Sequence, residues 1–388
     1  MEKDYVVLGR NEQRLYTWAM DVIYDKLSLK EFSVLSGLSY RHAQRVVKKI
    51  EKKGVLALAH GNLGKKPWNR TSDELKMQVM DLLVKRYSDF NLTHFREKLV
   101  EEHGLKVNRE VLRKWAKEKN LIKRPKRRKR KAHKPRPRMP RMGMLVQFDG
   151  SEFAWLGKNK PVYTAIGGID DATGKILFLE LFAAEDTFNC MKAMREIIRV
   201  YGVPEAFYVD CAGHFGKPYA KQDRTQIGRA LEELGCKVLF ATSPQAKGRI
   251  ERLWNTLQDR LVAELRHNGI QTVRQANNFI QKKFIPAFNE QFGVPAREAG
   301  LAFKPIEPYI RLGRIFCIKE KRRISTGNVF SFAGIKYVVH SDRDLRFRFI
   351  TIYIFENGDI EFELLGANVS VYKVGEASAE EENDDEAA

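Results

Sequence analysis

Apolar positions recur at helical spacing in the first 122 residues of the chain. A capping box at Ser28-Leu29-Lys30-Glu31 predicts a short helix that ends at Gly37. Ser39 then begins a second helix, whose core side carries Ala43, Val46, Val47 and Ile50. Residues 54–58 follow as a candidate strand, in the position of the wing of a winged helix-turn-helix.

A similar unit follows at residues 71–122. A second capping box, Thr71-Ser72-Asp73-Glu74, opens a helix, a further helix stops at Gly104, and Asn108 caps a third. In both units a glycine turn leads into a basic helix, as in helix-turn-helix modules that place the second helix in the major groove of DNA. The candidate DNA-reading residues are Arg41, Arg45 and Lys48 in the first unit and Arg109, Arg113 and Lys114 in the second. A merely solvated face is the alternative for each helix, and the repetition favours DNA reading.

From Gly143 onward the pattern changes to strands that alternate with helices. Runs at 144–149, 163–170 and 176–182 predict an antiparallel meander, and a helix over 186–201 follows. A strand ending at Asp210, a helix near 227–234 and a strand at 238–242 then predict an α/β unit. The next helix has an apolar stripe made of Ile250, Leu253, Trp254, Leu257, Leu261 and Leu265.

The last third of the chain predicts a helical connector over 272–292 and then several short strands between 315 and 372. Asn357-Gly358 between two apolar runs is a strong hairpin signal. We expect these strands to form a small β-barrel. Arg322, Arg323, Arg346 and Arg348 suit either a DNA-facing surface of it or ordinary solvent-facing charges.

The composition of the chain indicates that it binds a polyanion. The 388 residues carry a net charge of +20 with a pI near 9.7, which favours a nucleic acid as partner. Residues 123–141 hold twelve Lys or Arg and several prolines, so they form either a spacer or an extended arm that tracks the DNA backbone. Arm residues Arg127, Arg128, Lys129 and Arg130 are further candidate DNA contacts. The tail after Gly375 has seven acids and is expected to be disordered.

Other features narrow the setting of the protein. We find no run of 18 apolar residues and no signal peptide, and the four cysteines show no paired spacing. We therefore expect reduced thiols, no membrane association, and a cytoplasmic protein.

These patterns divide the chain into seven segments and predict a multidomain protein. Two helix-turn-helix modules cover 1–64 and 65–122, and a basic linker covers 123–142. A ribonuclease-H-like α/β catalytic core covers 143–268, a helical connector 269–309, the small β-barrel 310–375, and the acidic tail 376–388.

Three acids carry the candidate chemistry. Asp149 ends the first strand of the core, Asp210 ends a later one, and Glu251 heads the helix with the apolar stripe. A ribonuclease-H-like fold would bring the three together, where their mutual repulsion calls for cations. Two Mg²⁺ ions, with Mn²⁺ as a substitute, prefer such oxygen ligands and clamp the attacking and leaving oxygens of a phosphoryl displacement. Any one of the three acids, taken alone, is better explained as a turn, cap or solvated residue.

Neighbouring charges have simpler explanations. Asp170 and Asp171 precede Ala172-Thr173-Gly174, so a turn after a strand explains them. Lys247, Arg249 and Arg252 flank Glu251 and are candidate phosphate contacts, with a solvated role as an equal alternative.

The motifs resemble those of a known family, the DDE transposases of bacterial insertion sequences in the retroviral-integrase superfamily, and most closely its ISNCY-type group. The matching stretches are Gln147–Ser151, Asp170–Gly174, Tyr208–Asp210 with His214-Phe215, Thr256–Leu261 and above all Ser243–Arg252. Two departures concern the second acid: forty residues separate Asp210 from Glu251, and Cys211-Ala212-Gly213 replaces the usual basic and small residues. Neither removes a ligand.

The resemblance implies a prokaryotic, nucleoid-associated transposase that binds the terminal inverted repeats of its element. It would nick the 3′ ends by metal-assisted hydrolysis and join them to target double-stranded DNA, as a homo-oligomer on paired ends. The alternative is a domesticated, non-catalytic, sequence-specific DNA-binding protein, which an altered triad would favour. A simple nuclease of the same fold is the second alternative, and only strand joining separates it from a transposase.

Overall fold

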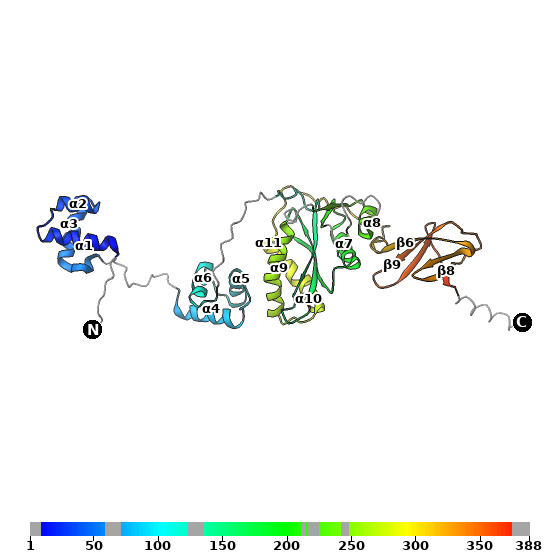
Figure 1. The fold of residues 1–388 in the computed structure, drawn as a ribbon, viewed down its shortest axis with the longest axis horizontal. Helices are drawn as coiled ribbons and strands as arrows, with labels where there is room; N and C mark the ends of the chain where they lie inside the picture. The colour runs from blue at the N-terminus through cyan, green and yellow to red at the C-terminus, as the bar shows by residue number, and fades with distance from the viewer. Residues whose placement is uncertain are drawn as a thin grey trace. The chain divides into compact units, whose positions relative to one another are not determined.

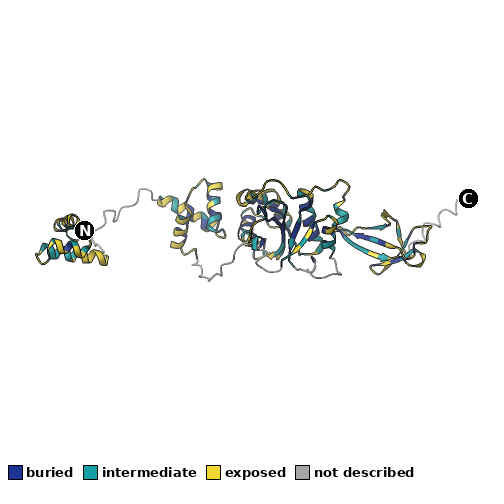
Figure 2. Ribbon diagram, turned by 90° about the horizontal axis from the view of Figure 1, so that it is seen from above, coloured by how far each residue is buried: buried dark blue, intermediate teal, exposed yellow. Residues whose placement is uncertain are grey.

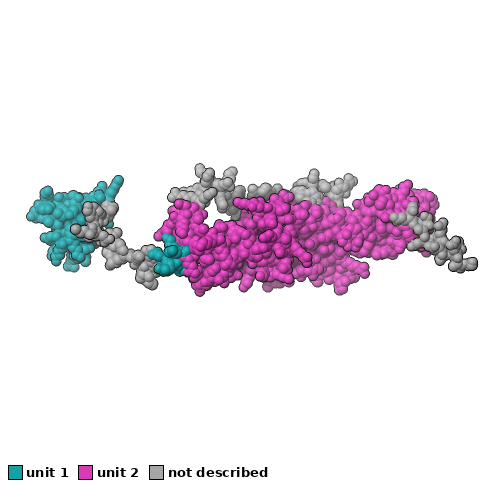
Figure 3. Space-filling view, turned by 90° about the horizontal axis from the view of Figure 1, so that it is seen from below, with its two compact units in different colours: residues 1–77 teal, residues 78–388 magenta. Residues whose placement is uncertain are grey.

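The computed structural model describes residues 9–58, 71–122, 136–210, 215, 225–241 and 248–374. Contacts divide the chain into two compact units, residues 1–77 and residues 78–388 (Figure 3). Among the helices described, none combines the length and the apolar character that crossing a lipid bilayer requires.

The first unit encloses a small core between helices α1 (Arg10–Ile23), α2 (Leu29–Ser36) and α3 (Tyr40–Lys53). The capping box is confirmed, because Ser28 Oγ accepts from the backbone N–H of Glu31 at 3.2 Å and Glu31 Oε2 accepts from that of Ser28 at 2.9 Å. Gly37 ends α2 in the left-handed conformation at φ 68°, as predicted. Helix α1 had no counterpart in the sequence prediction.

The predicted wing strand is wrong. Residues Gly54–Leu58 form a short 3₁₀ helix, η1, that folds back on α3 and buries Ala57 in the core of the three helices. Gly54 allows this reversal because it adopts φ 55°. A strand also needs a hydrogen-bonding partner, and the described residues of this unit contain no other strand.

Three further helices follow, α4 (Asp73–Lys85), α5 (Leu92–His103) and α6 (Arg109–Glu118). Asn91 and Asn108 cap α5 and α6 by accepting backbone N–H groups of the first turn. Gly104 ends α5 at φ 64°, as the pattern predicts. Helix α4 begins at Asp73, and Ser72 Oγ accepts from the N–H of Leu75 at 3.2 Å, so Ser72 rather than Thr71 occupies the cap position.

A mixed five-stranded sheet forms the centre of the second unit (Figure 1). Its strands are β1 (Val146–Phe153), β2 (Tyr163–Asp170), β3 (Ile176–Phe182), β4 (Ala206–Val209) and β5 (Lys237–Phe240), in the order β3-β2-β1-β4-β5. The meander of β1, β2 and β3 is antiparallel, whereas β4 is parallel to both β1 and β5. This is the topology expected of a ribonuclease-H-like core.

Helices cover both faces of this sheet (Figure 1). Helices α7 (Thr187–Tyr201) and α8 (Gln226–Glu233) pack on the face that carries Val146 and Phe148. Helices α9 (Gly248–His267), α10 (Val273–Phe279) and α11 (Ile285–Phe292) pack on the opposite face, with the short π-helix η3 (Ile280–Phe284) between the last two. Buried residues concentrate along the sheet between these two layers (Figure 2).

Strand β1 is longer than the sequence predicted. It continues past Asp149 to Phe153, because residues 150–153 pair with β2 as a hairpin beyond the end of β4. Asp149 therefore lies inside a strand rather than at its end.

The C-terminal strands form two antiparallel sheets around one apolar core. Four strands have the order β11-β10-β9-β6 and three the order β12-β8-β7, and Ile350, Ile352 and Phe330 lie in the shared core. Their bounds are β6 (Ile318–Arg323), β7 (Val329–Phe332), β8 (Ile335–Val339), β9 (Phe349–Ile354), β10 (Ile360–Leu364), β11 (Ala367–Asn368) and β12 (Val371–Lys373), and the short helices α12 (Leu312–Ile315) and η4 (Thr326–Asn328) accompany them.

The predicted hairpin at Asn357-Gly358 is confirmed, since β9 and β10 pair across it and Gly358 adopts φ 87°. No closed barrel is found among the described residues. The turn of η4 separates β6 from β7, with positive φ at Gly327 and Asn328, and the hydrogen-bond ladder does not continue between the two sheets.

Candidate functional site

The candidate site lies where β1, β4 and the first turn of α9 meet. The parallel register pairs Val146 with Phe207 and Gln147 with Tyr208. Continuing this register by two residues brings Asp149 opposite Asp210, one strand away. Neighbouring strands are about 4.8 Å apart, so this register is compatible with the predicted approach of the two acids, which stays a prediction.

Helix α9 approaches this edge through Trp254. The indole Nε1–H of Trp254 donates to Asp149 Oδ2 at 3.0 Å, and its ring packs so close to Gly167 on β2 that a Cβ there would lie 2.8 Å from Cη2. The third predicted acid, Glu251, lies on α9 three residues before Trp254 and is exposed. It therefore stands one helical turn from the residue that contacts Asp149.

The described residues stop short of a complete metal site. Within the ranges given above, no group of three or more His, Cys, Asp or Glu side chains is gathered closely enough to hold a metal ion. The donor chemistry nonetheless fits a hard divalent cation, because Asp149 and Asp210 each follow the paired positions of β1 and β4, and Glu251 lies on the helix that packs against β1. The role of the three acids stays a prediction.

A fourth acid, Glu185, lies beside the same edge, and sequence reasoning missed it. A Cβ on Gly150 would lie 2.1 Å from Glu185 Oε2, so the carboxylate occupies the space that this glycine leaves open, on the face of β1 opposite to the Asp149 side chain. Burial, and then the negative charges of Glu185, Asp186 and Asp210, raise the pKa of the Cys190 thiol beneath them. The charges of Glu185, Asp186 and Asp210 therefore all act on Cys190, which lies in the core on the Val146 and Phe148 face of the sheet.

Gln147 and Asp171 connect β1 to the first turn of α9. Gln147 is fully buried two residues before Asp149 and on the same face of β1, and its Oε1 accepts from the N–H of Ile250 at 3.2 Å. Its Nε2 donates to Asp171 Oδ1 at 2.6 Å. The explanation of Asp170 as a turn residue is confirmed, because it accepts from Thr173 N at 2.7 Å, but Asp171 reaches well beyond the turn.

Arg249, a predicted phosphate contact, is held by the same carboxylate. Its Nη1 donates to Asp171 Oδ1 at 2.8 Å, and its Nη2 donates to the carbonyl of Arg136 at 2.6 Å. Burial lowers the pKa of this guanidinium, and the charge of Asp171 opposes that shift. A phosphate contact through Arg249 stays a prediction, although the structure gives its side chain another partner.

The remaining predicted DNA contacts divide into two sets. Those in the described part of the chain are exposed on helices, namely Arg41, Arg45, Lys48, Arg109, Arg113, Lys114 and Arg252. Arg127, Arg128, Lys129, Arg130 and Lys247 lie outside the described residues, as do Cys211 and most of the stretch before α9. Cys190, Cys236 and Cys317 are free thiols, as expected.

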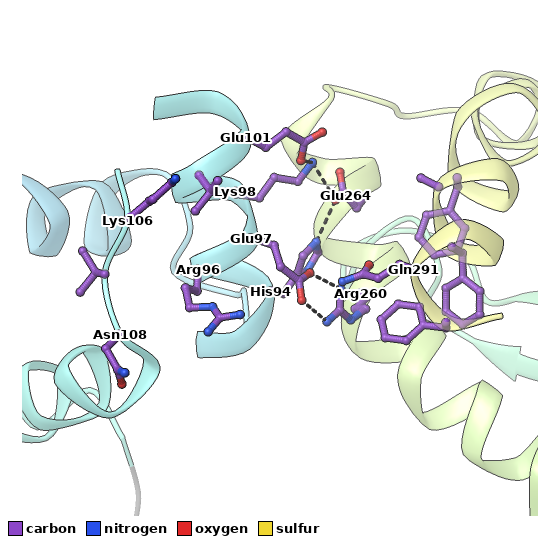
Figure 4. A pocket seen from close by; sticks show the side chains of 16 residues that line it. His94, Arg96, Glu97, Lys98, Glu101, Lys106, Asn108, Arg260, Glu264 and Gln291 are labelled. Atoms are coloured by element: carbon purple, nitrogen blue, oxygen red, sulfur yellow. Dashed lines mark hydrogen bonds and ion pairs between the residues drawn. The ribbon is translucent and has the colours of Figure 1, made fainter. Parts of the chain in front are cut away.

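Helix α5 lies against α9 and α11 through a charged contact (Figure 4). Arg260 of α9 donates to both carboxylate oxygens of Glu97, at 2.6 and 3.1 Å. Glu264, one turn further along α9, pairs with His94 at 2.8 Å and with Lys98 at 3.0 Å. The candidate catalytic helix is thus held at its N-terminal turn by β1 and at its C-terminal half by α5.

Comparison with known proteins places this geometry in a family. The strand order β3-β2-β1-β4-β5 is that of the ribonuclease-H-like class of α/β domain. The chain is 35% identical over 354 residues to y4bF of Sinorhizobium fredii, whose name describes it as a candidate transposase, with 89% of this chain and 77% of that protein covered. It is 32% identical over 375 residues to the transposase for insertion sequence IS1202 of Streptococcus pneumoniae, covering 84% of this chain and 78% of that protein. The chain belongs to the transposases of bacterial insertion sequences, as its motifs implied.

The other comparisons add little. No family model matches the chain. The catalytic core domain of HTLV-2 integrase in complex with magnesium is 14% identical, covering 37% of this chain and 88% of that one, with a TM-score of 0.29. The intasome of simian T-cell lymphotropic virus with a PP2A regulatory subunit is 12% identical, covering 75% and 98%, with a TM-score of 0.34.

Proposed function

We propose that this chain is an active DDE transposase that acts on double-stranded DNA, with Asp149, Asp210 and Glu251 as its metal ligands. It binds the terminal inverted repeats of its own element, nicks the 3′ ends, and joins them to target DNA. The observation that carries the proposal is the parallel pairing of β1 with β4 just before Asp149 and Asp210, together with the bonds of α9 to β1 at Ile250–Gln147 and Trp254–Asp149. Membership of the transposase family supports the reaction class.

The three carboxylates would hold Mg²⁺, or Mn²⁺ in its place, as a pair of ions. When bound, such ions supply an activated oxygen nucleophile and stabilise the charge that develops on the phosphodiester. The protein's part is to hold Asp149 in one orientation through Trp254, and to present Glu251 on the accessible side of α9. The exposed Arg252 and the neighbouring Lys247 suit phosphate contacts that orient the DNA strand without reading its sequence.

Recognition of the element's ends is assigned to the basic faces of α3 and α6. Their arginines and lysines are exposed, while the apolar faces are buried in the cores of their own helical groups. The two ends must be paired before joining, so we propose that a homo-oligomer assembles on them.

The test is the substitution Glu251→Gln, which keeps the size of the side chain and removes its charge. We expect nicking and joining of labelled DNA with the element's terminal sequence to fall below detection in Mg²⁺, while DNA binding stays close to the wild-type affinity. The matched control is Glu152→Gln, which removes an exposed acid of β1 at a position of opposite strand parity to Asp149.

The outcomes separate the alternatives. Normal nicking by Glu251→Gln shows that Glu251 is not a ligand. Nicking without joined products by the wild type identifies a nuclease, and sequence-specific binding with neither activity identifies a non-catalytic DNA-binding protein.

A further inference from the structure

Asp171 is a fully buried carboxylate with four hydrogen-bond donors around it. Its Oδ1 accepts from Gln147 Nε2 at 2.6 Å, from Arg249 Nη1 at 2.8 Å and from Arg136 Nη2, and its Oδ2 accepts from the N–H of Met139 at 2.8 Å. Removing a carboxylate from water is costly unless charged and hydrogen-bonding partners replace the solvent. So complete a set of partners far exceeds what a turn after β2 requires.

Two of these partners lead to the first turn of α9. Arg249 is the second residue of that helix, and Gln147 accepts from Ile250, the third. The first N–H groups of a helix have no partner within the helix, so they need one from outside. Here the partner of the Ile250 N–H is Gln147 Oε1 on β1, two residues before Asp149. Asp171 accepts from Gln147 Nε2 and so keeps Oε1 turned toward Ile250.

The same carboxylate also holds the chain that enters the core from the basic arm. Arg136 donates to Asp171 and accepts at its carbonyl from Arg249, and the N–H of Met139 donates to Asp171 Oδ2. Strand β1, helix α9 and the end of the arm are thus joined at one buried group.

We propose that Asp171 is a positioning residue, which acts through Gln147 and Arg249 to fix the first turn of α9, and with it Glu251, relative to Asp149. Its catalytic consequence rests on the proposed function of Glu251, whereas its effect on α9 does not. Groups that orient metal ligands from behind typically change metal affinity or activity about 10- to 100-fold when they are removed.

The neighbouring Asp170 provides a control that separates a positioning role of Asp171 from the general effect of removing a buried acid from this turn. Asp170 is as fully buried as Asp171, but its carboxylate accepts from Gly143 N at 2.9 Å and from Thr173 N and Oγ1, each at 2.7 Å. Asp170→Asn therefore removes a comparable charge whose three donors lie away from α9, and it serves as the matched control for Asp171→Asn.

The first measurement is amide hydrogen exchange of residues 248–253 in the full-length protein without metal. We expect exchange to rise about fivefold or more in Asp171→Asn, the factor for the loss of one hydrogen bond, and to stay at the wild-type rate in Asp170→Asn. Gln147→Met removes the acceptor of Ile250 at similar volume and is expected to show the same rise. It also keeps the test decisive if Asp171→Asn fails to fold.

The second measurement is calorimetric binding of Mn²⁺ to the same proteins. We expect affinity to weaken about 10- to 100-fold in Asp171→Asn and Gln147→Met, with Asp170→Asn close to wild type. Unchanged exchange at 248–253 in both Asp171→Asn and Gln147→Met overturns the proposal. A wild-type protein that binds no Mn²⁺ contradicts the proposed function instead, and the exchange result then still decides whether Asp171 positions α9.

Discussion

At the residue scale, an indole N–H of helix α9 helps to orient Asp149. The Nε1–H of Trp254 donates to Asp149 Oδ2, and the ring is held against Gly167, where β2 has no side chain to displace it. A hydrogen bond to one carboxylate oxygen fixes the rotamer of the group and the direction of its lone pairs. Orienting partners of this kind tune a metal ligand without touching the metal.

We predict that Trp254→Phe raises the Mg²⁺ concentration needed for half-maximal nicking by about tenfold. The substitution keeps an aromatic ring in the core and removes the N–H that holds Asp149. The measurement is a titration of nicking rate against Mg²⁺, together with the thermal midpoint of each protein.

Trp155→Phe is the control for this prediction. Trp155 is also buried in the core on this side of the sheet, but its Nε1–H donates to the backbone carbonyl of Ser151 at 3.0 Å. We expect it to lower stability and to leave the Mg²⁺ midpoint unchanged. Equal midpoints for the two variants would show that the bond to Asp149 has no orienting role.

The same residues show how far a site can be predicted from sequence. Strand alternation correctly placed Gln147 and Asp149 on one face of β1, because that inference needs only the local period. The contact of Trp254 with Asp149 and the bond of Arg249 to Asp171 join residues 105 and 78 positions apart. Local patterns carry no information about such partners, so Trp254 was predicted only as a core residue and Asp171 only as part of a turn.

At the scale of elements, α9 connects the candidate site to α5. Beyond the Arg260–Glu97 pair, Glu264 accepts from His94 and Lys98, and His267 pairs with Glu102 at 3.0 Å. Burial by itself raises the pKa of Glu264, but the bonds from His94 and Lys98 outweigh it, and the net pKa is lowered from the ordinary value of 4.5. The charged form of Glu264 is therefore the one that the folded protein stabilises.

This shift predicts an acid-sensitive contact between α5 and α9. Because the folded pKa lies below the unfolded one, the stabilisation is fully present above about pH 4.5 and disappears as the pH falls through the folded value. We expect the urea midpoint of the wild type to drop as the pH falls below about 4.5. Glu264→Gln should start from a lower midpoint at neutral pH and lose less over that window.

Glu101→Gln is the matched control, since Glu101 also pairs with Lys98 but its side chain is 67% exposed. Exposed pairs contribute little to stability, so its pH profile should follow that of the wild type. If Glu264→Gln loses as much as the wild type on acidification, other carboxylates govern the acid response.

Helices and strands were predicted correctly where a single periodicity of apolar residues, helical or strand-like, runs through the whole segment. Strands β2 and β3 have the bounds that the apolar runs indicate, and the buried stripe of α9 is the predicted one. It failed where tertiary contacts decide the conformation. Residues 54–58 form η1 because the core of the three helices takes up Ala57, and β1 runs past Asp149 because β2 offers it a partner. The C-terminal strands were predicted, but whether their sheets close depends on pairing between distant strands.

At the scale of the whole molecule, positive charge is divided between helices and a linker. The net charge of +20 includes the basic faces of α3 and α6 and the twelve Lys or Arg of residues 123–141. Base edges are read by side chains on helices in the major groove, whereas backbone contacts add affinity without sequence preference. The two sets of charges should therefore affect binding in different ways.

We predict that replacing Arg127, Arg128, Lys129 and Arg130 together with Gln weakens binding of the full-length protein to every DNA sequence alike. For every phosphate that the arm no longer neutralises, the slope of log affinity against log salt concentration should flatten by about 0.9.

Replacing Arg41, Arg45 and Lys48 with Gln should instead reduce the ratio between the affinity for DNA with the element's end and the affinity for scrambled DNA. Competition assays at several salt concentrations measure both quantities on the same proteins. An unchanged slope would make the arm a spacer, and an unchanged affinity ratio would remove α3 from the set of helices that read the element's end.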